Sequence, residues 1–434
     1  MKKIKLHYQI LISMILGIIV SLIFTRSDIF IPLGDLFIRL LKMIIVPLIF
    51  SSVVVGIGSI NKSINMKRIS LKTVFYYLST SLIAITIGLV LTNTIKPGQY
   101  FSINDSTEYS FCDRKAYNSI DECLQNCNID CTDKPLLSKA TSFGDMIYRI
   151  IPENPIKSFV DGDMLSIIFF SILLGFAITR LKNNHRTVIN SFFSSFHEAI
   201  MYITNLIITL APIGVFGLII KAFHHSGTNI IPSIGMYMLT ILIGLLIHIL
   251  LILPLIFRFF TKISPFIHYK AMSKAMLTAF STSSSSATLP VTMNCVEENV
   301  GVSKTTSSFV LPLGSTINMD GTALYECAGV LFISQVLQID LTILQQFTIV
   351  LTALLASIGA AGIPSAGLVM IFIVLKSVGL DSHPEVGIIV GTMLAVDRPL
   401  DMLRTMVNVT SDSIGAAIIG KSEGDNLYDK SEIH

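Results

Sequence analysis

Long apolar runs separated by short polar stretches make up most of this chain. A transmembrane helix needs about 20 mostly apolar residues. Eight runs approach or exceed that length, near residues 8–24, 29–58, 73–95, 159–179, 187–222, 229–257, 306–337 and 383–420. This pattern predicts an all-α integral membrane protein with eight transmembrane helices.

Two further apolar runs are interrupted by residues that do not suit a continuous helix in lipid. The run near 275–295 contains the polar stretch Ser281–Ser286, and the run near 345–376 contains the Gly- and Pro-bearing stretch Ser357–Gly367. Irregular backbone at membrane depth is tolerated only where protein or a watered cavity satisfies its polar groups. We therefore predict two re-entrant helical hairpins beside a central site, an arrangement typical of transporters.

The composition strengthens the membrane assignment. Charged residues are 14% of the chain and hydrophobic residues 52%, against about 25% charged in an average soluble protein. A large soluble protein is therefore not expected, and membrane lipid is an expected partner. The formal net charge of +3 gives no reason to expect nucleic acid as a partner.

Basic residues in the short connections predict the orientation in the membrane. Four groups of Lys and Arg fall on one side, which the positive-inside rule assigns to the cytoplasm. They are Lys2, Lys3 and Lys5; Lys62, Lys67, Arg68 and Lys72; Arg180, Lys182 and Arg186; and Arg258, Lys262, Lys270 and Lys274. A multi-pass protein of the cell membrane with both termini in the cytoplasm is expected. The alternative, that the first run is a signal peptide, is disfavoured because the run lacks a small-residue cleavage site.

The long polar segment 98–146 is expected on the outer side and holds four of the six cysteines, Cys112, Cys123, Cys127 and Cys131. In an oxidising compartment these four could form two disulfides. A zinc site and free thiols are the alternatives. Cys295 and Cys327 lie singly in apolar surroundings and are expected to be packing residues.

The last apolar run carries a stripe of polar residues. Asp397, Asp401, Thr405, Asn408 and Asp412 are spaced by four, four, three and four residues, which places them on one helix face, with Arg404 beside it. Each charge in a span costs about 2.5 to 3.5 kcal/mol. The stripe is therefore predicted to face partners or water inside the protein, with lipid on the other face. The alternative is a set of ion pairs that only holds the fold.

A second polar group interrupts the seventh run at Asn318–Thr322, with Glu326 nearby. Gly321 in mid-span predicts a local unwinding that frees carbonyl oxygens; close helix packing is the alternative. Such oxygens together with the carboxylates of Asp320 and Asp412 suit Na⁺, whereas no His or Cys cluster offers a site for a softer metal. No organic cofactor is expected.

Arg404 and Asp401 together indicate the kind of ligand. The guanidinium of Arg404 matches a carboxylate in two parallel hydrogen bonds, and Asp401 offers a negative charge for an ammonium group. Backbone N–H groups and hydroxyls at the hairpin ends would bind a second carboxylate. These residues predict an acidic amino acid as ligand, although Asp401 and Arg404 pairing only with each other is an alternative.

Four segments together resemble one family of transporters. Ser283–Thr288 followed by Leu289 and Pro290 resembles a serine-rich first hairpin, and Ala356–Gly367 a second one. Asn318–Thr322 resembles an unwound seventh helix and Asp401–Asp412 a ligand-reading eighth helix. The sequence is similar to the dicarboxylate/amino acid:cation symporters, the glutamate and aspartate transporters, over nearly its whole length. The resemblance implies a symporter that imports an acidic amino acid with Na⁺, with H⁺ as a further coupling ion.

The family resemblance also implies an organisation. It implies a homotrimer, inverted repeats, and a transport domain that moves like an elevator against a scaffold. The implied parts are scaffold spans in 1–72 and 147–222, transport-domain segments 73–97 and 223–420, the extracytoplasmic loop 98–146 and a cytoplasmic tail 421–434.

The resemblance assigns substrate contacts by position. Asp401 would bind the ammonium group and Arg404 the side-chain carboxylate. The main-chain carboxylate would fall to Asn408, Thr405, Ser284 and Ser285, with Thr322, Ile363 and Gly367 lining the pocket.

The same resemblance implies three sodium sites and one proton carrier. The sodium sets are Gly314, Asn318, Asn408 and Asp412; Thr316, Met319, Ser357, Ile358 and Ala360; and Tyr77, Thr80, Ser81, Asn318 and Asp320. Glu326 matches the position that carries a proton in proton-coupled relatives; the alternative is a buried carboxyl satisfied by its surroundings.

Rival functions remain. A symporter of the same family could carry C4-dicarboxylates or neutral amino acids, but Asp401 argues against the former and Arg404 against the latter. An intramembrane hydrolase using a serine of 281–286 would need a base, and no Gly-x-Ser-x-Gly elbow is present, so an enzyme is not expected. A passive channel or receptor would conduct or bind without concentrative uptake.

Overall fold

The computed structural model describes residues 6–24, 27–58, 64–100, 151–162, 164–226, 230–359, 366–381, 383 and 385–428. Within these ranges every regular element is a helix, and they contain no strand. Several predictions fall on residues outside the described ranges, namely Lys2, Lys3, Lys5, Lys62, Cys112, Cys123, Cys127, Cys131, Ala360, Ile363 and the loop residues 101–146.

One group of helices comes from the first half of the chain. It comprises α1 (Leu6–Ile23), the 3₁₀ turn η1 (Ser27–Phe30), α2 (Ile31–Gly58), α6 (Pro155–Asp161), α7 (Met164–Arg180), α8 (Asn183–Thr209) and α9 (Ala211–Ser226). Helix α2 packs against α7, α8 and α9, and α1 packs against α9. A Cβ at Gly217 would lie 2.5 Å from the amide nitrogen of Gly34, so α2 and α9 pack closely only because both positions are glycine.

The apolar run 187–222 is not one continuous helix. It is divided between α8 and α9 at Leu210. Pro212 stands in the first turn of α9, where its missing N–H needs no helical partner. Hydropathy alone did not distinguish a break from a continuous span, because both sides of the break are apolar.

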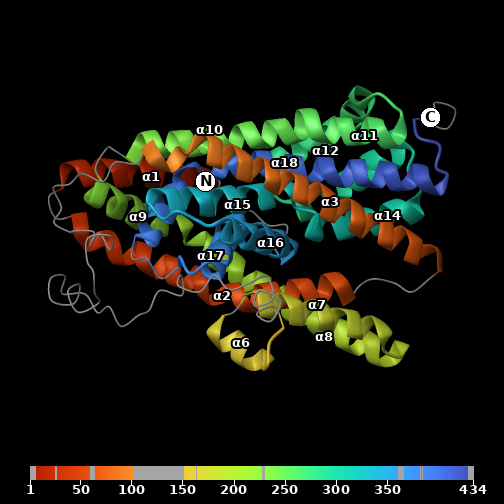
Figure 1. The fold of residues 1–434 in the computed structure, drawn as a ribbon, viewed down its shortest axis with the longest axis horizontal. Helices are drawn as coiled ribbons and strands as arrows, with labels where there is room; N and C mark the ends of the chain where they lie inside the picture. Colours follow the sequence, from red (N-terminus) through yellow and green to blue (C-terminus); the bar gives the residue numbers. More distant parts are fainter. Residues whose placement is uncertain are drawn as a thin grey trace, which may run out of the picture.

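The second group of helices surrounds α18 (Val386–Glu423). It comprises α3 (Ile64–Ile95), the 3₁₀ turn η2 (Pro97–Tyr100), α10 (Ile230–Ile247), the π-helical turn η5 (His248–Ile252), α11 (Leu253–Thr261), α12 (Pro265–Thr282), α13 (Ser285–Asn294), the π-helical turn η6 (Cys295–Val300), α14 (Lys304–Ile317), α15 (Asp320–Val336), α16 (Ile343–Gly359) and α17 (Ala366–Ser377). Helix α3 packs on α15, and α18 packs on α12, α14 and α15. Figure 1 shows α10, α11 and α12 along one side of the molecule and α2, α7 and α8 along the opposite side.

The predicted turn in the serine run is present. Helix α12 ends at Thr282, Ser283 adopts a left-handed conformation with φ of 51°, and the Ser284 hydroxyl accepts a hydrogen bond from the amide of Ala287 (3.2 Å) at the start of α13. This N-cap satisfies one of the free amides of the helix. The hairpin is longer than the predicted 275–295, since its first arm begins at Pro265. The arms of the second hairpin, α16 and α17, also contact each other.

An ion cluster connects the ends of α3 and α18. The carboxylate of Glu423 accepts hydrogen bonds from Arg68 and from Nζ of Lys72 (2.7 Å), and these bonds, with Arg68 contributing most, lower the pKa of Glu423. The Arg68 side chain is 64% exposed. The cluster is therefore expected to contribute little to stability, as is usual for ion pairs in water.

Two helical stretches among the described residues are long and apolar enough to cross a membrane by themselves, Arg68–Tyr100 and Pro232–Thr261. Four shorter helical stretches are also apolar, and they are Val46–Gly58, Ser166–Arg180, Ala211–Lys221 and Ile343–Ile358. Several other helices carry the buried charged and polar residues that form the candidate site.

Candidate site at the α14–α15 break and the polar stripe of α18

The seventh apolar run is broken between α14 and α15. The break falls at Asn318 and Met319, so the predicted unwinding exists, but it lies before Gly321 rather than at it. Gly321 is in the first turn of α15, where a Cβ would lie 2.9 Å from the carbonyl oxygen of Arg404. The alternative of close helix packing therefore describes Gly321: its missing side chain lets α15 approach the backbone of α18.

The polar stripe of α18 is buried. Its five members, Asp397, Asp401, Thr405, Asn408 and Asp412, and the neighbouring Arg404 are each exposed by 5% or less. The prediction that lipid covers the opposite face is wrong, since Leu400, Val407 and Ile414 are also buried. Helices α9, α12, α14 and α15 all pack on α18, so its apolar side chains face protein.

Arg404 is held by two carboxylates and an aromatic ring. Its Nη2 donates to Oδ1 of Asp401 (2.8 Å) and to Oδ1 of Asp397 (3.0 Å). Its guanidinium carbon lies 3.8 Å from the centroid of the Tyr325 ring, a cation–π contact. Asp401 and Arg404 therefore do pair with each other, as the alternative interpretation expected, but only Nη2 of Arg404 takes part in this pair.

The other two nitrogens of the Arg404 guanidinium are Nε and Nη1. Nε and Nη1 are buried and have no hydrogen-bond partner among the described residues. A buried donor without a partner costs about 1 to 3 kcal/mol. A Cβ at Gly367 would lie 2.5 Å from Nη1, so the first turn of α17 covers this part of the guanidinium. Thr322 borders the same position, 3.3 Å from that Cβ.

Asn408 connects the stripe to the start of α15. Its Oδ1 accepts a hydrogen bond from the amide of Gly321 (2.8 Å), and its Nδ2 donates to the hydroxyl of Thr322 (3.3 Å). The Thr405 hydroxyl donates to the carbonyl of Asp401 (2.8 Å) one turn earlier on its own helix. Thr322, Asn408 and Arg404 are therefore close together, as the family pattern implies for a ligand pocket.

Ser284 and Ser285 lie at the end of the first hairpin. Both are buried, and α13, which begins at Ser285, packs against α18. Thr282 and Thr288 also approach each other through their hydroxyls (3.0 Å). Amides and hydroxyls at the start of a helix are suited to an anion.

Two carboxylates of the predicted sodium sets are surrounded by oxygen-bearing side chains. Oδ1 of Asp412 accepts from Nδ2 of Asn318 (2.9 Å), and a Cβ at Gly314 would lie 2.5 Å from both that Oδ1 and the Tyr77 hydroxyl. Oδ1 of Asp320 accepts from the Ser81 hydroxyl (2.7 Å). Asn318 connects the two, because its Nδ2 also donates to the Ser411 hydroxyl (3.0 Å), which in turn donates to Oδ2 of Asp320 (2.7 Å). Its Oδ1 accepts a hydrogen bond from Thr80 (3.4 Å).

The predicted sets are only partly assembled. Asn408 bonds to Gly321 and Thr322 instead of to Asp412. For the remaining set, α14 and α16 are in contact, which brings the helix of Thr316 near that of Ser357 and Ile358. Thr316 and Ser357 donate to carbonyls of their own helices, those of Leu313 (3.0 Å) and Leu354 (2.9 Å). Met319 is buried at the break.

Glu326 is fully buried on α15. Neither of its carboxyl oxygens has a hydrogen-bond partner among the residues that the structure describes. The described residues therefore do not support the alternative interpretation, in which surrounding groups satisfy the hydrogen bonds of the Glu326 carboxyl. A buried ionised carboxylate without partners is unfavourable, so the neutral, protonated form suits this position.

The sequence pattern assigns no ligand or ion contact to four side chains that contact the site, although Asp397 is a member of the predicted stripe. Asp397 and Tyr325 hold Arg404, while Ser411 and His248 hold Asp320. His248 stands inside the apolar run 229–257, and an ionisable residue within a span is a functional candidate by default. An ionisable residue within an apolar run is therefore the sequence signal that would have identified His248.

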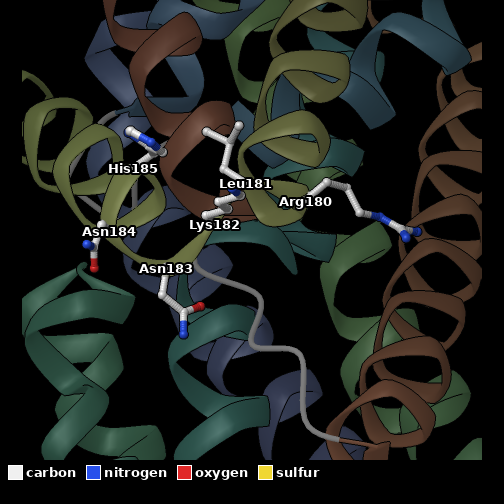
Figure 2. Close-up of a pocket in the computed structure, with 6 residues that line it drawn as sticks. All are labelled: Arg180, Leu181, Lys182, Asn183, Asn184 and His185. Carbon is white, nitrogen blue, oxygen red and sulfur yellow. The ribbon is translucent and has the colours of Figure 1, made fainter.

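A surface depression lies elsewhere, at the turn between α7 and α8. Figure 2 shows its lining residues, Arg180, Leu181, Lys182, Asn183, Asn184 and His185. None of these residues belongs to the predicted site. The arrangement around Arg404 is instead closed, in keeping with its 1% exposure.

Comparison with known proteins agrees with this geometry. The family model of sodium:dicarboxylate symporters matches residues 6–422. The chain belongs to this family. Because the members of this family are symporters, family membership argues against the hydrolase alternative. It also confirms the resemblance that the four motifs indicated.

Individual relatives of this symporter are excitatory amino acid transporters. Human excitatory amino acid transporter 3 is 38% identical over 416 residues, which cover 89% of this chain and 78% of that protein. Excitatory amino acid transporter 1 of Ambystoma tigrinum is 37% identical over 418 residues, with 89% and 76% covered. Human excitatory amino acid transporter 2 is 36% identical over 438 residues, with 92% and 75% covered.

Proposed function

We propose that this chain is a secondary active symporter that imports an acidic amino acid, glutamate or aspartate, driven by Na⁺. The observation that carries the proposal is the buried guanidinium of Arg404, which lies beside Asp401 and whose Nε and Nη1 have no hydrogen-bond partner among the described residues. Each of these two nitrogens carries an N–H group that a carboxylate oxygen can accept, and hydrogen bonds between ionised partners are the stronger ones. The names of the relatives support an amino acid as cargo.

The two charges distinguish this cargo from its rivals. Asp401 provides a negative charge for the ammonium group of an amino acid, which a C4-dicarboxylate lacks. Arg404 provides a positive charge for a side-chain carboxylate, which a neutral amino acid lacks. The first turn of α13 at Ser285 and the second N–H of Asn408 Nδ2, whose other N–H donates to Thr322, are assigned to the main-chain carboxylate.

Access to Arg404 requires movement. Because the side chain is 1% exposed, a ligand can reach it only when a covering element is displaced. Gly367, at the start of α17, covers Nη1. We assign this gating to the second hairpin, α16 and α17, with Ile363 and Ala360 in its connecting segment.

The sodium ions are cargo held by oxygen atoms. The carboxylates of Asp412 and Asp320, the amide of Asn318 and the hydroxyls of Thr80, Ser81 and Tyr77 form a donor set for a hard monovalent cation. The set around Thr316, Met319, Ser357, Ile358 and Ala360 is proposed to hold another ion.

The organisation is part of the same proposal. The packing of α1, α2, α7, α8 and α9 on one another supports a scaffold, and the packing of α3 and α10–α18 around the polar stripe supports a transport domain. The proposed organisation further includes elevator motion of the transport domain against the scaffold. It also includes eight spans with two hairpins, a homotrimer, and both termini in the cytoplasm.

Uptake into proteoliposomes tests the proposal. With the full chain reconstituted, an inward Na⁺ gradient is expected to drive concentrative uptake of radiolabelled glutamate or aspartate. Succinate and alanine serve as the competing dicarboxylate and neutral cargo. Concentration of either of these in preference to the acidic amino acids would refute the proposal. Ion currents without concentrative uptake would indicate a channel.

Replacing Glu326 with Gln is expected to abolish the response of uptake to an imposed pH gradient while Na⁺-driven uptake remains. The amide resembles the protonated carboxyl and cannot release its proton, so a coupled proton would be lost. Uptake is measured with Na⁺ and pH gradients imposed separately. Glu298→Gln, at an exposed position in η6, is the control and should behave as the wild type. An unchanged pH response of Glu326→Gln would exclude this residue as the proton carrier.

A further inference from the structure

His248 is a fully buried histidine in the middle of an apolar helix. Its Nε2 lies 3.0 Å from Oδ2 of Asp320, and both side chains are 0% exposed. A carboxylate can only accept hydrogen bonds, so the ring nitrogen donates. His248 is therefore a donor directed at one oxygen of a carboxylate that belongs to the proposed sodium set.

The backbone at His248 is shaped for this contact. Residues His248–Ile252 form the π-helical turn η5 between α10 and α11. A π turn is wider than an α turn and leaves backbone groups without regular partners; such turns occur frequently at functional sites. The carbonyl of Ile249 accepts a hydrogen bond from the hydroxyl of Tyr269 on α12. The turn is thus stabilised by a neighbouring helix, and it sets the direction of the His248 side chain.

The two oxygens of Asp320 have different surroundings. Oδ1 accepts a hydrogen bond from Ser81 of α3 (2.7 Å), a member of the proposed sodium set. Oδ2 accepts from Ser411 of α18 (2.7 Å) and from His248. Neither of these two donors belongs to the set. One oxygen therefore faces the cation ligands, while the other is held from behind by two helices.

We propose that His248 is a positioning residue for sodium: by binding Oδ2 of Asp320 it keeps Oδ1 directed at the cation ligands on α3. Outer-shell partners of metal-binding carboxylates commonly act in this way, and removing one typically costs about 10- to 100-fold in affinity. The inference rests on the proposed sodium coupling. It assigns a part in sodium coupling to His248, which stands on a helix that contributes no ligand to the proposed sodium set.

A merely structural role would have a different effect. If His248 only satisfied a buried carboxylate, replacing it would lower folding stability without a selective change in sodium affinity. The two roles separate when the sodium midpoint is measured independently of maximal rate and of substrate affinity.

The experiment compares His248→Leu with His248→Gln in the purified full chain. The sodium midpoint is taken from the Na⁺-dependent rise in melting temperature at constant ionic strength, and again from Na⁺-dependent uptake. His248→Leu is expected to raise both midpoints about 10-fold. His248→Gln is expected to stay close to the wild type, because its amide can donate to Asp320. The substrate midpoint at saturating Na⁺ should be unchanged in both variants.

His268→Gln is the matched control. His268 is also 0% exposed, but it bonds to Ser413 (2.9 Å) and Tyr428 (2.6 Å) instead of Asp320. Its replacement should leave the sodium midpoint unchanged. If His248→Leu does not fold, His248→Asn takes its place, since this amide is too short to reach Asp320 and should weaken sodium binding where Gln does not.

The outcomes are distinguishable. A wild type whose melting temperature does not respond to Na⁺ would overturn the proposed sodium coupling itself. A responsive wild type with an unchanged midpoint in His248→Leu, or in His248→Asn where Leu does not fold, would overturn the positioning role alone. Equal losses in the Asn and Gln variants would also overturn it, since they would show that the donor to Asp320 is not what matters.

Discussion

Replacing Arg404 with Ala is expected to raise the half-saturating concentration of glutamate or aspartate by about 100-fold, which corresponds to about 3 kcal/mol for two charge-assisted hydrogen bonds. The substitution removes Nε and Nη1, which have no partner among the described residues and which the proposal assigns to the side-chain carboxylate. It also leaves Asp397 and Asp401 without their buried partner. Neutral amino acids, which need no such partner, should be bound as well as before or better. Competition binding with acidic and neutral amino acids measures the change.

Arg398→Ala is the control for the Arg404 experiment. Arg398 is on the same helix and lies 3.6 Å from Oδ2 of Asp401, but its side chain is 25% exposed. Loss of the Arg398 side chain should change the affinity by only a small factor, because a partly exposed ion pair separated by 3.6 Å contributes little. If Arg404→Ala retained the preference for acidic amino acids, the assignment of Arg404 would be refuted.

The second large effect is expected for Asp412→Asn. The substitution keeps the size of the side chain but removes the negative charge beside Asn318, Gly314 and Tyr77. A cation site that loses a carboxylate loses its main attraction, so the Na⁺ midpoint for substrate binding should rise about 10- to 100-fold. The midpoint is measured by titrating Na⁺ at a fixed, low substrate concentration.

Asp425→Asn provides the comparison for Asp412. Asp425 accepts a hydrogen bond from the amide of Ser303 (2.9 Å) beyond the end of α18 and has no contact with the sodium set. Its replacement should leave the Na⁺ midpoint unchanged. A wild-type midpoint in Asp412→Asn would remove this carboxylate from the sodium site.

Much of the site was predictable because charge in an apolar segment is costly. The spacing of Asp397, Asp401, Asn408 and Asp412 indicated one helix face, and the cost of exposing it to lipid indicated burial. The burial of the polar stripe confirms that reasoning. The serine run likewise predicted a turn, since consecutive hydroxyl side chains compete with helical backbone bonds.

Other features depended on which helices meet. The pattern around Gly321 suggested an unwound backbone, but the break is at Asn318 and Met319, and Gly321 instead allows contact with the backbone of Arg404. A single glycine fits both situations, and only the neighbouring helix distinguishes them. The same applies to the apolar face of α18, which is covered by protein and not by lipid.

The amino-acid sequence alone determined the class of protein, the family and the set of polar residues from which a binding site must be built, because hydropathy and helical spacing are local properties. The tertiary structure decided which of those residues are partners. Tyr325 of α15 reaches Arg404 of α18, and His248 reaches Asp320 across 72 positions of chain. Such pairings depend on the packing of helices distant in sequence, and residue spacing along one helix contains no information about them.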